Sequence, residues 1–210
     1  GLDCPVVVRQ GIKPAFLRML GALGVGPERI IFHDPRGVSL FPRLYAPSWP
    51  LPRRGQPMSG VFDVYSALAG RRSPPAPGAG LRIYLSREGV EPRRLANEAE
   101  IRAVFERRGF LVVRAESLTF EQSQELFGAA SVVAGPYGSA FLNLIHTSAP
   151  ALAFAIMPPE RRDYLEELAL WVGSAGARFG YLFGKAAPAA TDQARWTAPR
   201  DRVEAALDEL

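Results

Sequence analysis

Residues 81–183 alternate between short apolar strands and helical segments, and this alternation limits the chain to few folds. The predicted strands are Leu81–Leu85, Phe110–Val113, Ser131–Ala134, Ala151–Ile156 and Phe179–Phe183, and the predicted helices are Asn97–Arg108, Phe120–Phe127, Ser139–Ile145 and Arg161–Val172. Strands that alternate with helices of this length specify βαβ units with right-handed crossovers. We therefore predict an α/β fold with a Rossmann-like parallel sheet and helices on both faces.

Residues 1–57 have a similar but shorter pattern. Strands are expected at Cys4–Val8, Arg29–Phe32 and Val38–Leu44, and a helix is expected from Pro14 to near Gly24. So short a segment buries too little apolar surface to be stable alone. We predict that it is the tail of an N-terminal α/β domain that begins before Gly1. Its exposed strands are then expected to favour self-association or docking of the missing N-terminal segment.

The rest of the chain divides by composition into a linker helix with a Pro/Gly-rich linker, a Rossmann-like domain, and a loop with a C-terminal helix: residues 58–80, 81–185 and 186–210. The linker helix is expected at Gly60–Ala69, and the stretch RRSPPAPGAG follows it. In the domain, Thr119 and Gln122 form a capping-box pattern. In the C-terminal helix, Arg200–Leu210, we expect Val203 and Leu207 to face inward.

Charge and cysteine content exclude several classes of function. The net charge is +4, but there are only two lysines, and the arginines are scattered without a nucleic-acid-binding motif. We therefore expect no nucleic-acid partner; arginine instead suits phosphate, which its planar guanidinium binds in bidentate fashion. One cysteine and two histidines leave too few ligands for a zinc site, so we expect no metal. No apolar run reaches the ~18 residues of a membrane span, and we expect a cytoplasmic protein or one peripheral to the membrane.

The turn after strand Ser131–Ala134 is the strongest candidate for a binding site. It reads Gly135-Pro136-Tyr137-Gly138-Ser139-Ala140 and leads directly into a predicted helix. Glycine lets the backbone approach a ligand closely, and the N–H groups at a helix start favour an anion. The turn lacks the Gly-x-Gly-x-x-Gly fingerprint, which disfavours a dinucleotide-dependent oxidoreductase. Many such turns use glycine only for packing, so the motif alone leaves both interpretations open.

Ser86 and Arg87 follow strand Leu81–Leu85, and Arg94 comes shortly afterwards. In an open α/β sheet the ligand binds outside the carboxyl ends of the strands. Arg87 and the 135–140 turn are therefore expected at one edge, where Arg87 or Arg94 would grip a diphosphate. The alternative for both arginines is a solvated loop. For Asn97-Glu98 the favoured interpretation is a helix N-cap with a first-turn acid.

Several of these motifs, taken in order, resemble a known family. They are Arg82-Ile83-Tyr84-Leu85-Ser86-Arg87, Arg94-x-x-Asn97-Glu98, Gly109-Phe110 and Gly135-Pro136-Tyr137-Gly138-Ser139-Ala140. Together they resemble the carboxyl-terminal half of family 61 glycosyltransferases. The opening stretch is similar as well, with a helix that ends in Leu-Gly and an Ala46-Pro47-Ser48 segment. Tyr137 stands where the family usually has histidine, and Ala140-Phe141 where it usually has Gly-Leu.

The resemblance implies a two-domain GT-B arrangement whose second Rossmann-like domain, here residues 81–185, binds a nucleotide-diphosphate sugar. It implies an inverting, metal-independent transfer to a hydroxyl group of a glycan or other acceptor, in surface polysaccharide biosynthesis, with the donor as substrate and no cofactor. The implied donor-binding residues are Arg87, Arg94, Gly135, Tyr137, Gly138, Ser139 and Ala140. Since most of the first domain lies outside the chain, we expect the chain alone to be inactive. The alternative is a degenerate, non-catalytic domain that binds a nucleotide or a protein partner.

The base of such a reaction is the least defined residue. His33 and Asp34 follow strand Arg29–Phe32 and are weak candidates, with a loop role as the alternative. The remaining histidine and the aromatic residues are assigned to structure: His146 at a helix end, Trp49, Trp171 and Trp196 as packing anchors, and Tyr181 and Phe183 as core strand residues.

Overall fold

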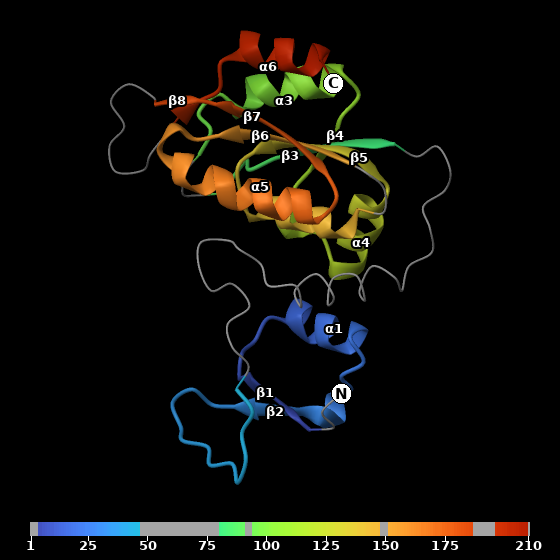
Figure 1. Cartoon of the computed structure of the whole chain (residues 1–210), viewed down its shortest axis with the longest axis vertical. Helices are drawn as coiled ribbons and strands as arrows, with labels where there is room; N and C mark the ends of the chain where they lie inside the picture. Colours follow the sequence, from blue (N-terminus) through green and yellow to red (C-terminus); the bar gives the residue numbers. More distant parts are fainter. Residues whose placement is uncertain (1–3, 47–79, 91–93, 148–150, 187–195, 210) are drawn as a thin grey trace. The chain divides into compact units, whose positions relative to one another are not determined.

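The computed structural model describes residues 4–46, 80–90, 94–147, 151–186 and 196–209. The described residues fall in two compact units, one with residues 4–46 and one with the residues from 80 onward, and each is described by itself (Figure 1). The linker helix expected at residues 60–69, the Pro/Gly-rich linker up to residue 79, and Trp49 lie outside the described residues.

The larger unit is built on a five-stranded parallel sheet. Its strands stand in the order β4-β3-β5-β6-β7, with the bounds Leu111–Val113, Leu81–Leu85, Ala130–Pro136, Leu152–Met157 and Arg178–Phe183. Every neighbouring pair is parallel. Counted within this unit the order is 2-1-3-4-5, which is that of a doubly wound α/β sheet. This arrangement agrees with the predicted Rossmann-like fold.

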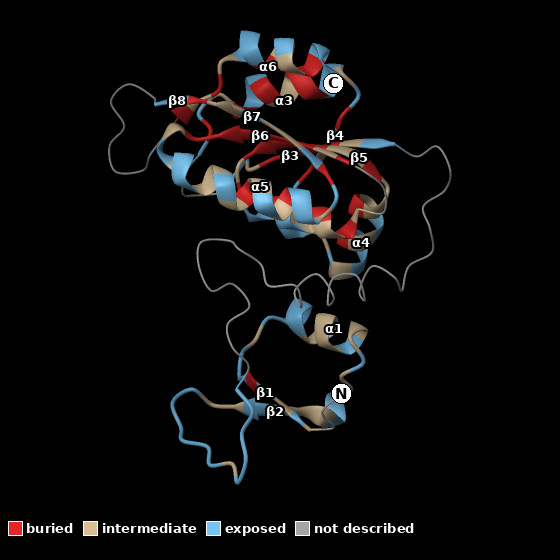
Figure 2. Cartoon of the chain, in the orientation of Figure 1, coloured by how far each residue is buried: buried red, intermediate tan, exposed pale blue. Residues whose placement is uncertain are grey.

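Helices cover both faces of this sheet (Figure 1). The pair on one face is α3 and α6, and the pair on the other is α4 and α5: Glu98–Arg107, Arg200–Asp208, Phe120–Gly128 and Leu165–Ser174. Side chains alternate along β3 accordingly, since Tyr84 packs in the core under α3 and α6, and Ile83 and Leu85 pack in the core under α4 and α5. Buried residues gather in these two layers (Figure 2).

Several local predictions are confirmed in this unit. Val203 and Leu207 are buried on the inner face of α6, and Trp196 is a packing anchor in the same core. Thr119 and Gln122 form the predicted capping box at the start of α4. His146 is buried and packs edge-to-face on Phe120, with 5.7 Å between the ring centroids, which agrees with a structural role. Of these features, the capping box depends on side chains close in sequence and the burial of Val203 and Leu207 on helical periodicity.

Other segments differ from the prediction. Residues 139–146 form a 3₁₀ helix, η3 (Ser139–His146), rather than an α-helix. The helix predicted at residues 161–172 starts earlier, as the 3₁₀ helix η4 (Pro159–Tyr164), and becomes α-helical only in α5. Prolines favour an early helix start, and Arg161 interrupts the helix with φ −110° and ψ 31°.

The end of the sheet also departs from expectation. Tyr181 was expected in the core but is 50% exposed, because β7 is the edge strand of the described sheet; Phe183 is half-buried against the core. The segment predicted as a loop before the C-terminal helix contributes to a short antiparallel pair, β8 (Lys185–Ala186) with β9 (Trp196–Thr197).

The smaller unit holds one parallel strand pair, with a helix and a 3₁₀ turn between the strands. The elements are β1, α1, η1 and β2: Val6–Arg9, Pro14–Ala22, Pro27–Arg29 and Ile30–His33. The third strand, predicted at Val38–Leu44, does not form. Pro42 within it has no N–H to donate to a ladder, and Val38 and Leu40 are 90% and 91% exposed.

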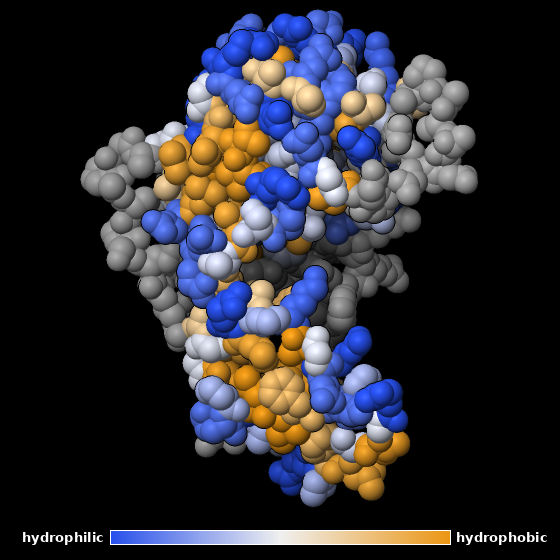
Figure 3. Space-filling model, turned by 180° about the vertical axis from the view of Figure 1, so that it is seen from behind, coloured by the Kyte–Doolittle hydropathy of each residue, from blue (hydrophilic) through white to orange (hydrophobic). Residues whose placement is uncertain are grey.

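The smaller unit buries little of its apolar surface. Val8 is the only buried residue among its described residues, 4–46, and α1 buries none (Figure 2). Phe16, Phe32 and Leu44 are all more than half exposed. Hydrophobic side chains accordingly gather on this unit, drawn at the bottom of Figure 3.

Candidate functional site

The carboxyl ends of β3 and β5 lie side by side where the strand order reverses. The chain passes from β3 to β4 on one side of the sheet and then returns to place β5 on the other side of β3. Doubly wound sheets bind their ligands at this topological switch point. Ser86 and Arg87 directly follow β3, and the 135–140 turn includes the end of β5. The structure thus brings together the two segments that the sequence singles out.

Arg87 and Gly138 are in direct proximity at this switch point. A Cβ atom added to Gly138 would collide with Nη1 of Arg87. The backbone of Gly138 is extended, with φ −177° and ψ 170°, which any residue can adopt, so glycine at this position matters only for the space that it leaves to the Arg87 guanidinium. Positive charge is therefore held against the turn that precedes η3.

Gly135 has a different reason to be glycine. Its φ is +147°, which side-chain-bearing residues rarely adopt, and a Cβ atom there would lie 2.6 Å from the carbonyl oxygen of Leu85. Tyr137, two residues later, donates its backbone N–H to the carbonyl oxygen of Ile156 at 2.8 Å. The turn therefore passes close to the end of β3, and the hydrogen bond to Ile156 ties it to β6.

The start of η3 offers backbone N–H groups next to Arg87. Phe141 donates its N–H to the carbonyl oxygen of Gly138 at 3.2 Å, as in the first turn of a 3₁₀ helix. The N–H groups of Ser139 and Ala140 precede this bond, and a helix start leaves such groups without a helical acceptor. Ser139 is exposed and Ala140 is half-buried. An anion beside Arg87 would meet donors of the kind that suit it.

A buried carboxylate holds the loop that carries Arg87. Oε1 of Glu98 accepts a hydrogen bond from the backbone N–H of Arg87 at 2.6 Å and another from the Ser86 hydroxyl at 2.8 Å. Glu98 and Ser86 are only 6% and 5% exposed. The sequence interpretation of Glu98 as a first-turn acid is therefore incomplete, since its side chain turns inward to the loop after β3.

The loop is tied in two further places. Glu88 forms an ion pair with Arg102, which lies one helical turn after Glu98 on α3. Val90 donates its N–H to the carbonyl oxygen of Arg87 at 2.9 Å, and Gly89 has φ +82°, so residues 87–90 form a tight turn that needs glycine. Helix α3 thus fixes both the backbone and a side chain of this loop.

Tyr84 is buried close to the same carboxylate. Burial first, and then the charge of Glu98, raise the pKa of the Tyr84 hydroxyl well above its usual value. The hydroxyl has no hydrogen-bond partner among the described residues, and the ring is tilted against Phe105 with centroids 4.6 Å apart. Tyr84 therefore stays neutral at physiological pH and serves as a core side chain.

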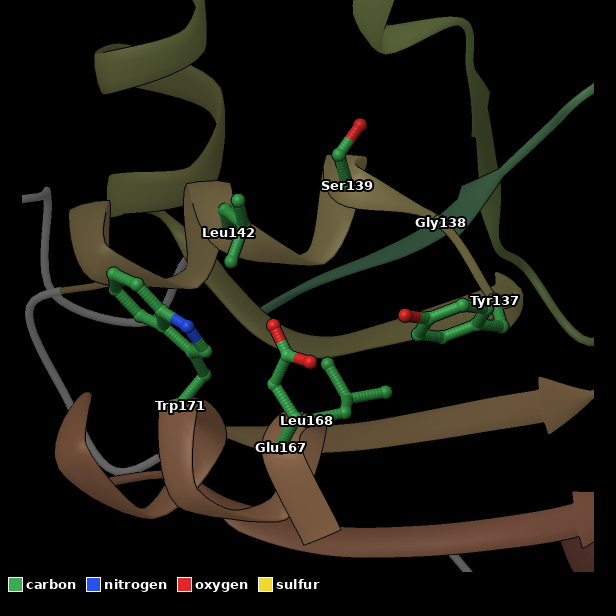
Figure 4. Close-up of a pocket in the computed structure, with 7 residues that line it drawn as sticks. All are labelled: Tyr137, Gly138, Ser139, Leu142, Glu167, Leu168 and Trp171. Atoms are coloured by element: carbon green, nitrogen blue, oxygen red, sulfur yellow. The ribbon is translucent and has the colours of Figure 1, made fainter. Parts of the chain in front are cut away.

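A pocket of about 190 Å³ opens beside the turn, on the α5 side. Its lining residues are Tyr137, Gly138, Ser139, Leu142, Glu167, Leu168 and Trp171. Figure 4 shows the Tyr137 hydroxyl pointing toward the Glu167 carboxylate, with the Trp171 indole on the other side of that carboxylate. The sequence motifs do not single out Glu167, and they predict Trp171 only as a packing anchor. The available signal is their i, i+4 spacing, which places both on one face of α5.

Asn97 departs from its predicted role. It occupies the N-cap position of α3, but its side chain makes no capping hydrogen bond. Its amide instead pairs with the backbone of Ala198: Oδ1 accepts the N–H at 3.0 Å, and Nδ2 donates to the carbonyl oxygen at 2.9 Å. Asn97 thus joins the start of α3 to the segment before α6, while its neighbour Glu98 holds the loop after β3.

The structure does not place Arg94 against the 135–140 turn as it does Arg87. It is exposed and precedes Leu95, which is buried and forms a bridge with Trp196. A contact between Arg94 and the 135–140 turn therefore remains a prediction from the sequence.

The candidates for a base lie in the smaller unit. Nδ1 of His33 lies 2.8 Å from the Ser39 hydroxyl. Asp34 accepts hydrogen bonds from the side chain of Arg36 and, to smaller effect, from its backbone N–H, and these bonds lower the pKa of the Asp34 carboxyl group. Asp34 thus has a structural role in the loop, and a lowered pKa makes a carboxylate a weaker base.

Across the described ranges, no three His, Cys, Asp or Glu side chains gather where they could hold a metal ion. None of the helices in those ranges is long and apolar enough to cross a membrane.

Comparison with known proteins identifies one family. The family model described as Glycosyltransferase 61 matches residues 15–162, which is more than half of the chain. The match includes Arg87, Glu98 and the 135–140 turn, and it ends within η4. No curated protein matches the chain.

Proposed function

Because this chain belongs to the glycosyltransferase 61 family, we propose that it takes a nucleotide-diphosphate sugar as donor and transfers the sugar to a hydroxyl group of a glycan or other acceptor. The donor diphosphate binds between Arg87 and residues 138–140. The family match supports a glycosyltransferase and does not favour the alternative, a non-catalytic nucleotide- or partner-binding domain.

The position of Arg87 against Gly138 carries this proposal. Guanidinium binds phosphate oxygens in bidentate fashion, and the N–H groups at the start of η3 are the second kind of donor that an anion needs. Both stand at the switch point of the sheet, outside the carboxyl ends of β3 and β5. Gly138 leaves room for the guanidinium that any larger residue would displace.

The proposed reaction is a direct displacement at the anomeric carbon, with inversion. The acceptor oxygen forms its bond to that carbon while the bond to the diphosphate oxygen breaks, and the diphosphate leaves with the electron pair. Negative charge therefore grows on the diphosphate, where Arg87 and the N–H groups of Ser139 and Ala140 stabilise it in the manner of an oxyanion hole. Because arginine supplies the positive charge, we propose that the transfer needs no metal.

The acceptor proton passes to a base in this scheme. Of the two candidates, His33 is the first to test, because hydrogen bonds from Arg36 lower the pKa of Asp34. Surface polysaccharide biosynthesis in the cytoplasm remains our prediction for the setting of the reaction.

Calorimetric titration with UDP and GDP tests the donor site. We expect Arg87→Ala to weaken binding about 10- to 100-fold, because a charge-assisted hydrogen bond contributes roughly 1.5–3 kcal/mol. Arg202, exposed on α6, supplies the matched control, and Arg202→Ala is expected to leave the affinity unchanged. Failure of both nucleotides to bind, or equal affinity of parent and Arg87→Ala, contradicts the proposal.

A further inference from the structure

We infer that Glu98 is a positioning residue for Arg87. Its buried carboxylate fixes the peptide of Arg87 and thereby keeps the guanidinium beside Gly138. This inference rests on the proposed function, because it requires that Arg87 bind the donor diphosphate.

The hydrogen bonds of Glu98 carry the inference. One carboxylate oxygen, Oε1, accepts both the Arg87 N–H at 2.6 Å and the Ser86 hydroxyl at 2.8 Å. Hydrogen bonds to an ionised acceptor are shorter and stronger than neutral ones. The carbonyl oxygen of Arg87 accepts a hydrogen bond from the N–H of Val90, so both the backbone N–H and the backbone carbonyl of Arg87 are hydrogen-bonded. These two bonds fix the backbone position from which the Arg87 side chain extends.

The burial of Glu98 shows that it does more than begin a helix. An acid in the first turn of a helix favours the helix dipole from a solvated position. Glu100, in the same turn of α3, is exposed and pairs with Arg200. Glu98 instead loses most of its contact with solvent, and its Oε2 has no hydrogen-bond partner among the described residues. Burying a carboxylate is unfavourable unless it is hydrogen-bonded, and here the compensating bonds go to the loop after β3.

Positioning of this kind changes affinity through preorganisation. If the Arg87 peptide is released, the loop samples other conformations, and the donor must order it again when it binds. The guanidinium then also leaves the space over Gly138 part of the time. Both effects act only through Arg87, and this dependence separates positioning from a general loss of stability.

Two conservative variants distinguish the reach of the side chain from its charge. Glu98→Gln keeps the length and an oxygen acceptor but loses the charge. Glu98→Asp keeps the charge but is one methylene shorter and cannot hold both donors. Positioning predicts that Glu98→Asp weakens the binding of UDP or GDP about tenfold and that Glu98→Gln stays within about threefold of the parent. The reverse order overturns the inference.

A double-mutant cycle with Arg87→Ala completes the test. In the Arg87→Ala background, Glu98→Asp is expected to cause no further loss of affinity, because the residue that it positions is gone. Glu106→Gln is the matched control, since it removes an α3 carboxylate that pairs with the same Arg102 but lies outside the loop, and it leaves the Arg87 N–H on Glu98. We expect this control to bind like the parent.

The outcomes separate the inference from the proposed function. If Arg87→Ala binds both nucleotides as the parent does, the proposed function fails. If Arg87→Ala weakens binding but Glu98→Asp weakens it equally in both backgrounds, only the positioning role fails. Should Glu98→Asp not fold, the amide proton of Arg87 decides by NMR: we expect it far downfield in the parent and shifted in Glu98→Gln. An Arg87 amide that Glu98→Gln leaves unmoved overturns the inference.

Discussion

The Arg87 guanidinium occupies the space in which a side chain at Gly138 would begin. Gly138→Ala therefore sets a methyl group against Nη1 of Arg87, and we expect Arg87 to move away. Since the backbone at Gly138 is extended, alanine causes no backbone strain, and the fold should persist. We expect UDP or GDP affinity to fall about tenfold by calorimetry, through lost contacts of Arg87.

A matched glycine substitution controls for general effects. Gly173 lies near the end of α5, and a Cβ atom there meets nothing within 4 Å. Gly173→Ala should leave affinity unchanged and stabilise the helix by roughly 0.5–1 kcal/mol. Parent-like affinity of Gly138→Ala would show that the proximity of Arg87 to Gly138 is irrelevant to binding.

Tyr137→His should make donor binding dependent on pH. Tyr137 is half-buried at the turn, and its ring centroid lies 6.1 Å from that of Tyr164. An imidazole here titrates near pH 6.5, so it becomes a cation beside the expected diphosphate as the pH falls. The affinity of Tyr137→His relative to the parent is therefore expected to rise below about pH 6.5. Calorimetry at several pH values measures this ratio, and a constant ratio contradicts the prediction.

Asn97→Ala should destabilise the larger unit. The change removes both hydrogen bonds to Ala198 and leaves that backbone without its partner. We expect a loss of about 1–3 kcal/mol in the free energy of unfolding, measured by urea denaturation. Asn143→Ala, which removes a local bond to Ala140 at 3.1 Å, should cost less. Equal losses of unfolding free energy in the two variants would mean that the hydrogen bonds to Ala198 stabilise the protein no more than a local bond does.

Tyr84→Phe should preserve or increase stability, and it should change the pH dependence. The hydroxyl is buried without a hydrogen-bond partner among the described residues, so its removal relieves a desolvation cost on the order of 1 kcal/mol. The folded protein keeps Tyr84 neutral because its pKa is raised, whereas the unfolded chain ionises it above about pH 10. The free energy of unfolding of the parent should therefore fall more steeply than that of the variant as the pH rises past 10, by up to about 1.4 kcal/mol per pH unit. Urea denaturation at about pH 8 and about pH 11 measures the difference, and parallel pH profiles contradict the prediction.

Sequence reasoning succeeded where the determinants are periodic or local. The strands and helices of residues 81–183 follow from alternating apolar patterns, and the capping box of Thr119 and Gln122 from residues three apart. The common edge of Arg87 and the 135–140 turn follows from the rule that ligands bind at carboxyl strand ends. That β3 and β5 are direct neighbours is a property of the strand order, which no local pattern specifies.

The residues whose roles differ from the prediction have partners far away in sequence. Glu98 was interpreted from its place in a helix turn, but its burial depends on a loop eleven residues earlier. Asn97 was interpreted as a cap, but it bonds 101 residues ahead. The 3₁₀ form of η3 and the split before α5 reflect tight connections between strands and helices, where tertiary contacts override helix propensity.

The link between Asn97 and Ala198 has a consequence for the order in which the chain can fold. Under α4 and α5, the core uses no residue later than Phe183, whereas the core under α3 and α6 needs Trp196, Val203 and Leu207. During synthesis, the core under α4 and α5 can therefore pack while Tyr84, Ile101 and Phe105 of the other core are still exposed. The emerging polypeptide thus exposes an apolar face of the sheet, of the kind that chaperones bind, until α6 has been synthesised.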